Sequence, residues 1–111
     1  MKVDRVKGYL DLLLLGILSE DAGHGYAVIS ALRERTNGLI DLTEGAVYPA
    51  LHRLEDDGLL VSEWQPVAGR RRRLYRITAA GRAALKKERS EWERLSSAIA
   101  LVLAAPNAAT A

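Results

Sequence analysis

Apolar residues recur at helical spacing in four segments of this chain, and this pattern predicts four helices. The segments are residues 8–20, 24–36, 43–58 and 79–104. Two shorter apolar runs, at 60–64 and 73–77, flank a polar turn and predict a pair of strands. Leu39–Leu42 can form a further short strand. The predicted fold class is therefore mainly α with a small β-hairpin.

The first predicted helix is apolar on more than one side. Its main stripe consists of Leu10, Leu13, Leu14, Ile17 and Leu18. Leu12 and Leu15 fall outside this stripe, so the helix needs a second apolar partner besides its own domain. The apolar run LLLLGIL is too short to span a membrane, and we interpret it as part of a buried helix.

The second and third predicted helices have recognisable ends. Asn37 and Gly38 tolerate the left-handed conformation that ends many helices, so they end the second helix. Thr43 is an N-cap residue for the third helix. Pro49 lies inside this helix and should bend it or confine its first turns. The inward positions are Tyr26, Ile29 and Leu32 or Arg33 in the second helix, and Ala50, Leu51 and Leu54 in the third.

The last predicted helix, capped by Thr78, is roughly 40 Å long at about 1.5 Å per residue. Its apolar positions follow a coiled-coil-like repeat of seven residues. The seam consists of Leu85, Trp92, Leu95, Ile99 and Val102, with Glu88 as its polar member. Because a domain this small cannot bury such a seam alone, a homodimer held by this helix is the economical interpretation.

The composition fits one small domain with a helical extension. The chain has 111 residues, of which 49% are hydrophobic, enough for a single small core. The sequence holds no Cys, which removes disulfides, thiolate metal sites and cysteine catalysis. This composition suits a reducing cytosol, and we expect a cytoplasmic protein.

Charge is distributed unevenly around the predicted hairpin, although the net charge of the chain is only +2. Residues 43–58 hold one Arg and four acidic residues, a net charge of −3. Residues 59–78 hold five Arg and one Glu, a net charge of +4. A local basic patch suits a focused contact with phosphate, and a solvated hairpin tip would account for the charge equally well.

A capped helix, a strand, an arginine-rich turn and a second strand together form the outline of a winged helix-turn-helix. In such a domain a helix end enters the major groove and the hairpin, or wing, contacts phosphate. This outline divides the chain into a winged helix-turn-helix DNA-binding domain at 1–78, a C-terminal dimerisation helix at 79–104 and a disordered tail at 105–111.

Several motifs support this outline: HGY at 24–26, LTEGAVYPALHRLEDDGLL at 42–60, EW at 63–64, GRRRRLYRIT at 69–78 and SEW at 90–92. With these motifs the chain resembles the PadR family of bacterial transcriptional regulators, in the subfamily with a single C-terminal dimerisation helix. The resemblance implies a homodimeric repressor that binds a pseudo-palindromic operator in double-stranded DNA. It also implies that a small-molecule effector releases the repressor from the operator.

The expected DNA contacts of the third helix lie near its N-terminal end. They are Thr43, Ala46, Val47 and Tyr48. Small side chains there can touch bases, and hydroxyl groups can reach phosphate. Tyr48 can instead pack in the core, and the motif around it favours the phosphate contact. Arg53, further along, can reach the DNA backbone or pair with the acidic residues at 55–57.

The expected DNA contacts of the wing are Gly69, Arg70, Arg71, Arg72 and Arg73. Gly69 permits the turn, and the arginines alternate sides, so two or three of them can face one phosphate strand. The planar guanidinium fork suits phosphate and can also enter a narrow minor groove.

Trp92 has two interpretations. Its place in the seven-residue repeat makes it a dimer-seam residue. The family resemblance instead implies a flat cavity between the two subunits, in which this tryptophan stacks on a planar aromatic effector. Leu12 would then form an apolar wall, while Glu88 and Ser96 would supply polar contacts. Both interpretations hold if the seam is too wide to close.

No metal, cofactor or catalytic site is expected from the sequence. His24 and His52 have no cluster of metal ligands near them, and His24 is expected to satisfy backbone groups of the second helix. No catalytic constellation stands out, so we expect no enzyme. The alternatives to an operator-binding regulator are a winged-helix protein that binds only other proteins, against which the arginines argue, and a small-molecule-binding dimer without operator binding.

Overall fold

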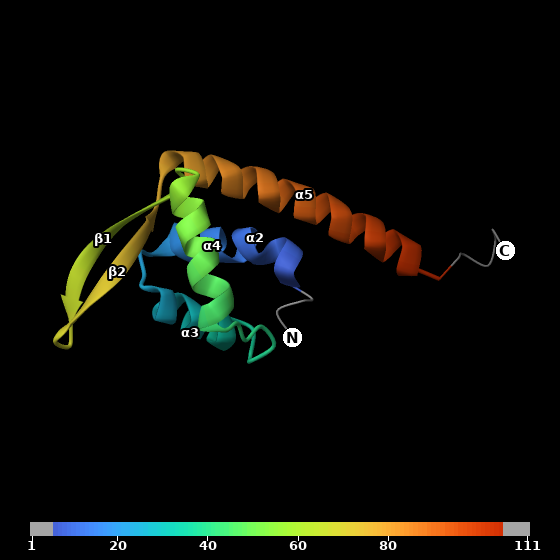
Figure 1. The fold of residues 1–111 in the computed structure, drawn as a ribbon. Helices are drawn as coiled ribbons and strands as arrows, with labels where there is room; N and C mark the ends of the chain where they lie inside the picture. The colour runs from blue at the N-terminus through green and yellow to red at the C-terminus, as the bar shows by residue number, and fades with distance from the viewer. Residues whose placement is uncertain (1–5, 106–111) are drawn as a thin grey trace.

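In the computed structural model, which describes residues 6–105, the helices and the hairpin follow the predicted order (Figure 1). The elements are η1 (Lys7–Tyr9), α2 (Leu10–Glu20), α3 (Gly25–Arg35), α4 (Glu44–Asp56), β1 (Leu60–Val67), β2 (Arg70–Ile77) and α5 (Ala79–Leu103). The helix predicted over 8–20 thus begins with a short 3-10 turn. Apart from Ala105, the tail predicted to be disordered lies outside the described residues.

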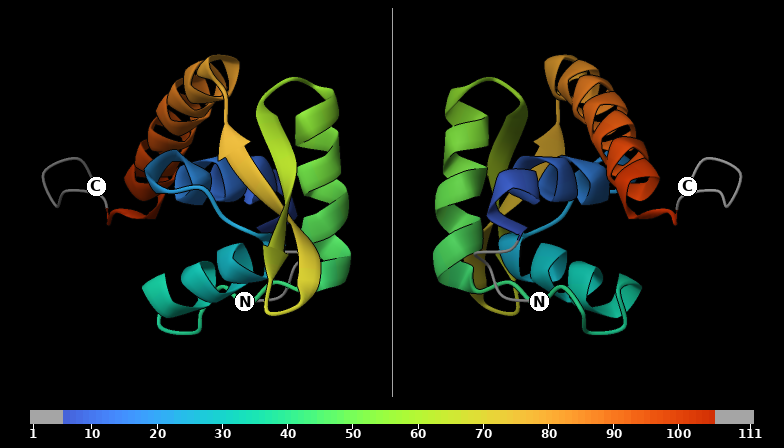
Figure 2. Two further views of the ribbon diagram at one scale, coloured as in Figure 1. Left: turned by 90° about the vertical axis from the view of Figure 1, so that its left-hand side faces the viewer. Right: turned by 90° about the vertical axis from the view of Figure 1, so that its right-hand side faces the viewer.

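The core lies where α2, α3 and α4 meet, and the hairpin closes one end of it (Figures 1 and 2). Its most deeply buried side chains are Leu14, Leu15, Leu18, Val28, Val47, Leu51, Leu54 and Tyr75. The first half of α5 packs against α2, and its second half extends past the body of the domain (Figure 1). The body of the domain and the second half of α5 therefore present separate surfaces.

Two positions differ from the predicted apolar stripes. Leu15 is 1% exposed although it was predicted to lie outside the stripe of the first helix. The reason is that α2 packs against α3 and α4 and also against α5, so it is buried on more than one side. Tyr26, predicted to face inward, is 53% exposed, because α3 turns Val28, Ile29 and Leu32 toward the core instead.

The predicted strand at Leu39–Leu42 is wrong, because this segment of the described chain is irregular. Thr36 fixes the segment through its hydroxyl oxygen, which accepts a hydrogen bond from the Ile40 amide at 2.9 Å. The free edge of β2 pairs instead with Gly23, just before α3. The Gly23 amide donates to the Tyr75 carbonyl at 3.0 Å, and the Tyr75 amide donates to the Gly23 carbonyl at 2.9 Å.

Both predicted threonine caps are present. The Thr43 hydroxyl oxygen accepts from the Ala46 amide at 3.2 Å, which begins α4. The Thr78 hydroxyl oxygen accepts from the Gly81 amide at 3.0 Å and donates to the Gly58 carbonyl at 2.7 Å. Thr78 therefore begins α5 and ties it to the end of α4.

The other predicted helix breakers act differently from one another. Asn37, with φ of 52°, and Gly38, with φ of 82°, adopt the predicted left-handed conformation after α3. Pro49 neither begins nor ends α4, which runs unbroken from Glu44 to Asp56. Pro49 lies on the exposed side of the helix, where the backbone carbonyl that it leaves without a donor can be solvated.

The hairpin is longer than predicted because its arginines lie in a strand rather than in the turn. Strands β1 and β2 pair antiparallel from Leu60 opposite Ile77 to Val67 opposite Arg70. The two residues between the strands, Ala68 and Gly69, have φ of 50° and 78°. Two successive positive φ angles are typical of the tight turn that best fits the twist of a hairpin, and glycine adopts this conformation without strain.

Candidate nucleic-acid interface

The N-terminal end of α4 presents a small exposed surface. Thr43 and Glu44 are exposed and Ala46 is half-buried, so these residues are accessible to a ligand. Val47, predicted to contact DNA, is 0% exposed and packs in the core. The predicted DNA contact of Val47 is therefore wrong. Val47 shares the inward face of the helix with Ala50, three residues later, and Leu51, four residues later.

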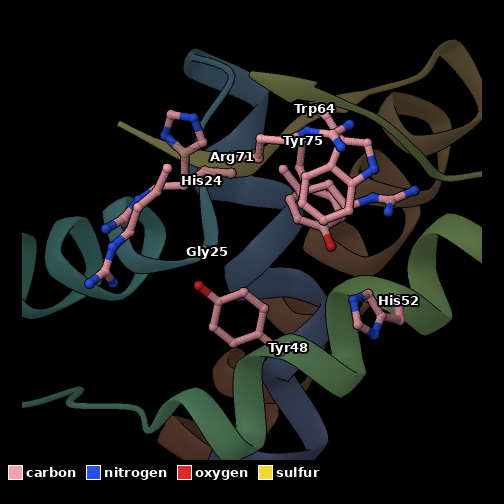
Figure 3. Close-up of a pocket in the computed structure, with 10 residues that line it drawn as sticks. His24, Gly25, Tyr48, His52, Trp64, Arg71 and Tyr75 are labelled. Atoms are coloured by element: carbon pink, nitrogen blue, oxygen red, sulfur yellow. The ribbon is translucent and has the colours of Figure 1, made fainter. Parts of the chain in front are cut away.

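Tyr48 combines the two roles considered for it. Its ring is half-buried and packs against the core cluster. The ring also lies against Gly25, the first residue of α3: a Cβ atom at Gly25 would come within 2.7 Å of two Tyr48 ring carbons and 2.9 Å of the hydroxyl oxygen. Only glycine allows this close approach. The hydroxyl points toward the start of α3 (Figure 3).

Arg53 is held by a partner that the sequence did not indicate. Its two terminal nitrogens bond the two carboxylate oxygens of Asp11, on α2, at 3.0 and 2.5 Å. Hydrogen bonding to Asp11 is the main reason why the pKa of Arg53 is raised. The expected pairing with residues 55–57 is therefore wrong. The guanidinium fork is thus engaged within the domain, and the expected contact of Arg53 with the DNA backbone stays a prediction.

The wing arginines surround an aromatic ring. The guanidinium carbons of Arg71 and Arg73 lie 5.1 and 4.9 Å from the centre of the Trp64 ring, a cation–π arrangement. Arg73 also donates to the Ser62 hydroxyl at 2.6 Å and lies 3.8 Å from Glu55. Arg73 is thus tied into the domain, whereas Arg71 is exposed.

The wing, α4 and the start of α3 enclose an open hollow of about 410 Å³ (Figure 3). We call it the basic hollow. It is lined by His24, Gly25, Tyr48, His52, Trp64, Arg70, Arg71, Arg72, Arg73 and Tyr75. Four of these residues are arginines, two are histidines and none is acidic, so the lining favours an anionic ligand.

Two polar atoms at this hollow lack a hydrogen-bond partner among the described residues. They are the Tyr75 hydroxyl oxygen and the Nε2 atom of His24, both buried. His24 caps α3 only through its backbone carbonyl, so the expectation that its side chain satisfies helix backbone groups is wrong. Burial is the main reason why the pKa of Tyr75 is raised, with Glu55 and Tyr48 adding to the effect and Arg73 opposing it.

A second hollow of about 400 Å³ lies between α2 and α5, and we call it the apolar hollow. It is lined by Val6, Tyr9, Leu12, Leu13, Ile40, Arg89, Trp92 and Glu93. The structure thus brings Leu12 and Trp92 together, as the effector prediction requires. Glu88 and Ser96 do not belong to this lining. The charged groups beside Trp92 in this hollow are those of Arg89 and Glu93. The contacts of Glu88 and Ser96 with an effector were expected between two subunits, and they stay a prediction.

The predicted seam on α5 divides into two parts. Leu85 is 6% exposed and belongs to the core of its own chain, so it is not available as a dimer contact. Beyond it, α5 carries an apolar stripe that the other described residues leave partly or mostly exposed. The stripe comprises Trp92, Leu95, Ile99 and Val102, with Leu101 and Leu103 beside it.

Within residues 6–105, no group of three or more His, Cys, Asp or Glu side chains is placed to hold a metal ion. Over the same residues, no helix has the length and apolar character needed to cross a membrane.

Sequence reasoning missed Gly25, His52, Trp64 and Tyr75 as members of the basic hollow. These residues come from α3, α4, β1 and β2, and no spacing along the chain connects them. The HGY motif was the one available signal, because it places a small residue at the start of a helix.

The sequence model of the transcriptional regulator PadR-like family matches residues 14–87 of this chain. A transcriptional regulator of Mycobacterium tuberculosis is 58% identical over 55 residues, which make up 50% of this chain and 51% of that protein. The matched part of the chain thus spans about half the length of this curated relative.

Solved structures extend the likeness to nearly the whole chain. A transcriptional regulator from Clostridium thermocellum is similar with a TM-score of 0.84 at 32% identity, over 91% of this chain and 99% of that chain. A PadR family transcriptional regulator from Eggerthella lenta is similar with a TM-score of 0.82 at 29% identity, over 94% and 89% of the two chains. The predicted fold class, a winged helix-turn-helix with a long C-terminal helix, is confirmed.

Proposed function

Because the chain belongs to the PadR-like family of transcriptional regulators, we propose that it is a homodimeric repressor of a pseudo-palindromic operator, released by a small effector. Regulators of this family bind DNA. The observation that carries the proposal here is the basic hollow, where four arginines of the wing share one lining with Tyr48 and His52 of α4 and no lining residue is acidic.

In this proposal α4 and the wing contact different parts of the DNA. The exposed end of α4, with Thr43 and Ala46, enters the major groove, while Tyr48 donates its hydroxyl to phosphate. Gly69 shapes the tip of the wing. Arg70, Arg71 and Arg72, which follow it, contact the DNA backbone. Arg73 holds the strand in place through its hydrogen bond to Ser62 and its ion pair with Glu55.

The contact between the wing and DNA predicts a steep dependence of duplex binding on salt, because each neutralised phosphate releases counterions. Arg71→Ala and Arg72→Ala should each lower the slope of log K against log salt concentration by about one. Arg76→Ala is the matched control, because Arg76 lies on the same strand but outside the basic hollow, 3.6 Å from Glu63.

Wild-type, Arg71→Ala, Arg72→Ala and Arg76→Ala proteins should be titrated into one duplex over a range of salt concentrations. Equal slopes for the wild type and both wing variants would contradict the wing contact. A wild-type protein that binds no duplex at low salt would favour the alternative, a ligand-binding or protein-binding dimer without an operator.

The second part of the proposal is that α5 joins two chains. The exposed apolar stripe of α5 supports it, because Trp92, Leu95 and Ile99 are each close to half exposed and Val102 is mostly exposed in the single chain. An apolar helix face of this kind is stabilised when a second copy covers it.

The third part is that a flat aromatic effector binds between the two subunits at Trp92. The apolar hollow supports it, because Leu12, Leu13 and Trp92 offer aliphatic and aromatic surfaces for stacking and burial. Arg89 and Glu93 at this hollow, rather than Glu88 and Ser96, supply the nearest charges. An effector that binds one arrangement of the two domains better than the other would shift operator affinity.

The effector site is tested by fluorescence in a Trp64→Phe background, where Trp92 is the remaining tryptophan. Planar aromatic dyes should quench Trp92 at about one dye per dimer, since two symmetry-related indoles can sandwich one ring. Trp92→Ala, measured by dye fluorescence and sedimentation, should lose dye binding and remain a dimer. Unchanged dye affinity in Trp92→Ala, or its dissociation into monomers, would make Trp92 a seam residue only.

A further inference from the structure

Tyr75 is buried in a way that hydrogen bonding within the protein does not explain. The residue is 0% exposed, and its hydroxyl has no hydrogen-bond partner within residues 6–105. A buried polar group without a partner destabilises a protein, and most buried polar groups therefore have one. The hydroxyl points into the basic hollow, toward the space between Tyr48 and His52 (Figure 3).

The opposite wall of the hollow is the N-terminal end of α3, a helix of 11 residues. The first amides of a helix have no acceptor within it, and they attract anions. Here the His24 side chain makes no capping hydrogen bond in the described structure. Gly25 has no side chain that would block the amides, and the Tyr48 hydroxyl lies beside it.

The two walls are held at a fixed spacing. Two backbone hydrogen bonds, of 3.0 and 2.9 Å, join Gly23 to Tyr75, so β2 and the start of α3 form one unit. Between these walls the charged lining consists of arginines and no acidic side chain. A helix end, two phenolic hydroxyls and the wing arginines thus line one space.

We propose that the basic hollow seats one phosphate group of the DNA backbone, bound by the α3 amides, by the hydroxyls of Tyr48 and Tyr75 and by the wing arginines. This inference rests on the proposed DNA binding and adds residues of α3 and Tyr75 to it. A phosphodiester carries one negative charge and offers oxygens in several directions, so it can accept from both walls at once.

The inference assigns a donor role to the Tyr75 hydroxyl. Burial raises the pKa of Tyr75, so the group keeps its proton at neutral pH and can donate to phosphate. The hydroxyl is buried in the free protein, so the proposal requires the side chains that cover it to shift when phosphate binds.

Tyr75→Phe tests the proposed phosphate site, because this substitution removes the hydroxyl oxygen and keeps the aromatic ring. If the hydroxyl serves phosphate, the free protein should keep or raise its thermal midpoint, since an unpaired buried group is lost. DNA affinity should fall about tenfold, for specific and non-specific duplexes alike, because a hydrogen bond to a charged group is lost. Ser97→Ala, which removes an exposed hydroxyl on α5 outside the hollow, should change neither quantity.

The result that would overturn the inference is a Tyr75→Phe protein with wild-type DNA affinity. A variant whose thermal midpoint falls in step with its DNA affinity would also overturn it, because Tyr75 would then be structural. Absence of duplex binding by the wild type would contradict the proposed function itself, and it would also contradict the proposed phosphate site.

Two further arms identify the source of the phosphate. Duplexes with one neutral methylphosphonate linkage, scanned along the bound sequence, should include one that weakens binding of the wild type more than it weakens binding of Tyr75→Phe, which keeps its other phosphate contacts. If every neutral linkage weakens the binding of both proteins equally, no phosphate is coupled to Tyr75, and the proposed phosphate site is disproved. If no linkage is coupled to Tyr75 while inorganic phosphate without DNA raises the thermal midpoint of the wild type more than that of Tyr75→Phe, the hollow is a free-anion site, and the DNA assignment is disproved.

Discussion

Val47 and Tyr48 are neighbours on α4, yet one lies in the core and the other at the basic hollow. The turn of about 100° per helical residue separates them. The burial of Val47 could be predicted from the sequence, because Val47, Ala50, Leu51 and Leu54 follow the spacing i, i+3, i+4, i+7. The predicted contact of Val47 with DNA was wrong because the prediction used the position of Val47 near the helix end and ignored which face of the helix its side chain occupies.

Other residue-scale features could not be predicted, because they depend on contacts between distant segments. Arg53 and Asp11 are 42 residues apart in the chain. The contact of Tyr48 with Gly25 joins the middle of one helix to the start of another. Neither periodicity nor composition carries information about which helix ends meet, so the basic hollow became visible only in the folded chain.

The raised pKa of Tyr75 predicts a loss of stability in alkaline solution. An unfolded tyrosine loses its proton near its ordinary pKa of 10.0, while the folded protein retains it. The contribution of Tyr75 is therefore fully present below that pH and is lost as the pH rises toward the folded pKa. Tyr75→Phe should lose less stability than the wild type between about pH 9 and pH 11.

Urea unfolding of both proteins across this range measures the effect as a difference, so the titration of lysines and other tyrosines cancels. Parallel curves for the wild type and Tyr75→Phe would show that the Tyr75 hydroxyl titrates normally in the folded protein.

At the scale of the elements, helices were predicted more accurately than strands. Thr43 and Thr78 cap their helices through local hydrogen bonds, and the sequence around each contains the required groups. The strand expected at Leu39–Leu42 was wrong because pairing needs a partner edge, and Gly23 occupies the edge of β2. The arginines of β2 were assigned to the turn because their polarity does not distinguish a strand from a loop.

The exposed half of α5 predicts a specific effect of charge on assembly. Ile99→Glu places a carboxylate in the uncovered apolar stripe, where a homodimer interface would leave it buried and unpaired. The variant should dissociate into folded monomers, because residue 99 lies outside the core of its own chain. Sedimentation gives the mass and circular dichroism gives the helix content.

Ser97→Glu is the control for this change, since Ser97 is exposed on α5 outside the predicted seam. It should remain a dimer. A dimeric Ile99→Glu protein, or a wild type that sediments as a monomer, would contradict the assignment of α5 to dimerisation.

At the scale of the whole molecule, the two hollows belong to different parts of the fold. The basic hollow lies among α3, α4 and the hairpin, and the apolar hollow lies between α2 and α5. Helix α2 contacts both parts, because Leu12 lines the apolar hollow while the preceding residue, Asp11, holds Arg53 on α4. This arrangement supports the proposal that a ligand at α5 alters the placement of the winged domain.

The central claim is that two such domains, joined by α5, bind one symmetric DNA site. Duplexes selected from random DNA by the wild type, followed by hydroxyl-radical footprinting, test it most directly. We expect two protected patches related by two-fold symmetry, with centres about one helical turn, roughly 10 base pairs, or a multiple of it apart. A single asymmetric patch, or selection that enriches no sequence, would contradict it.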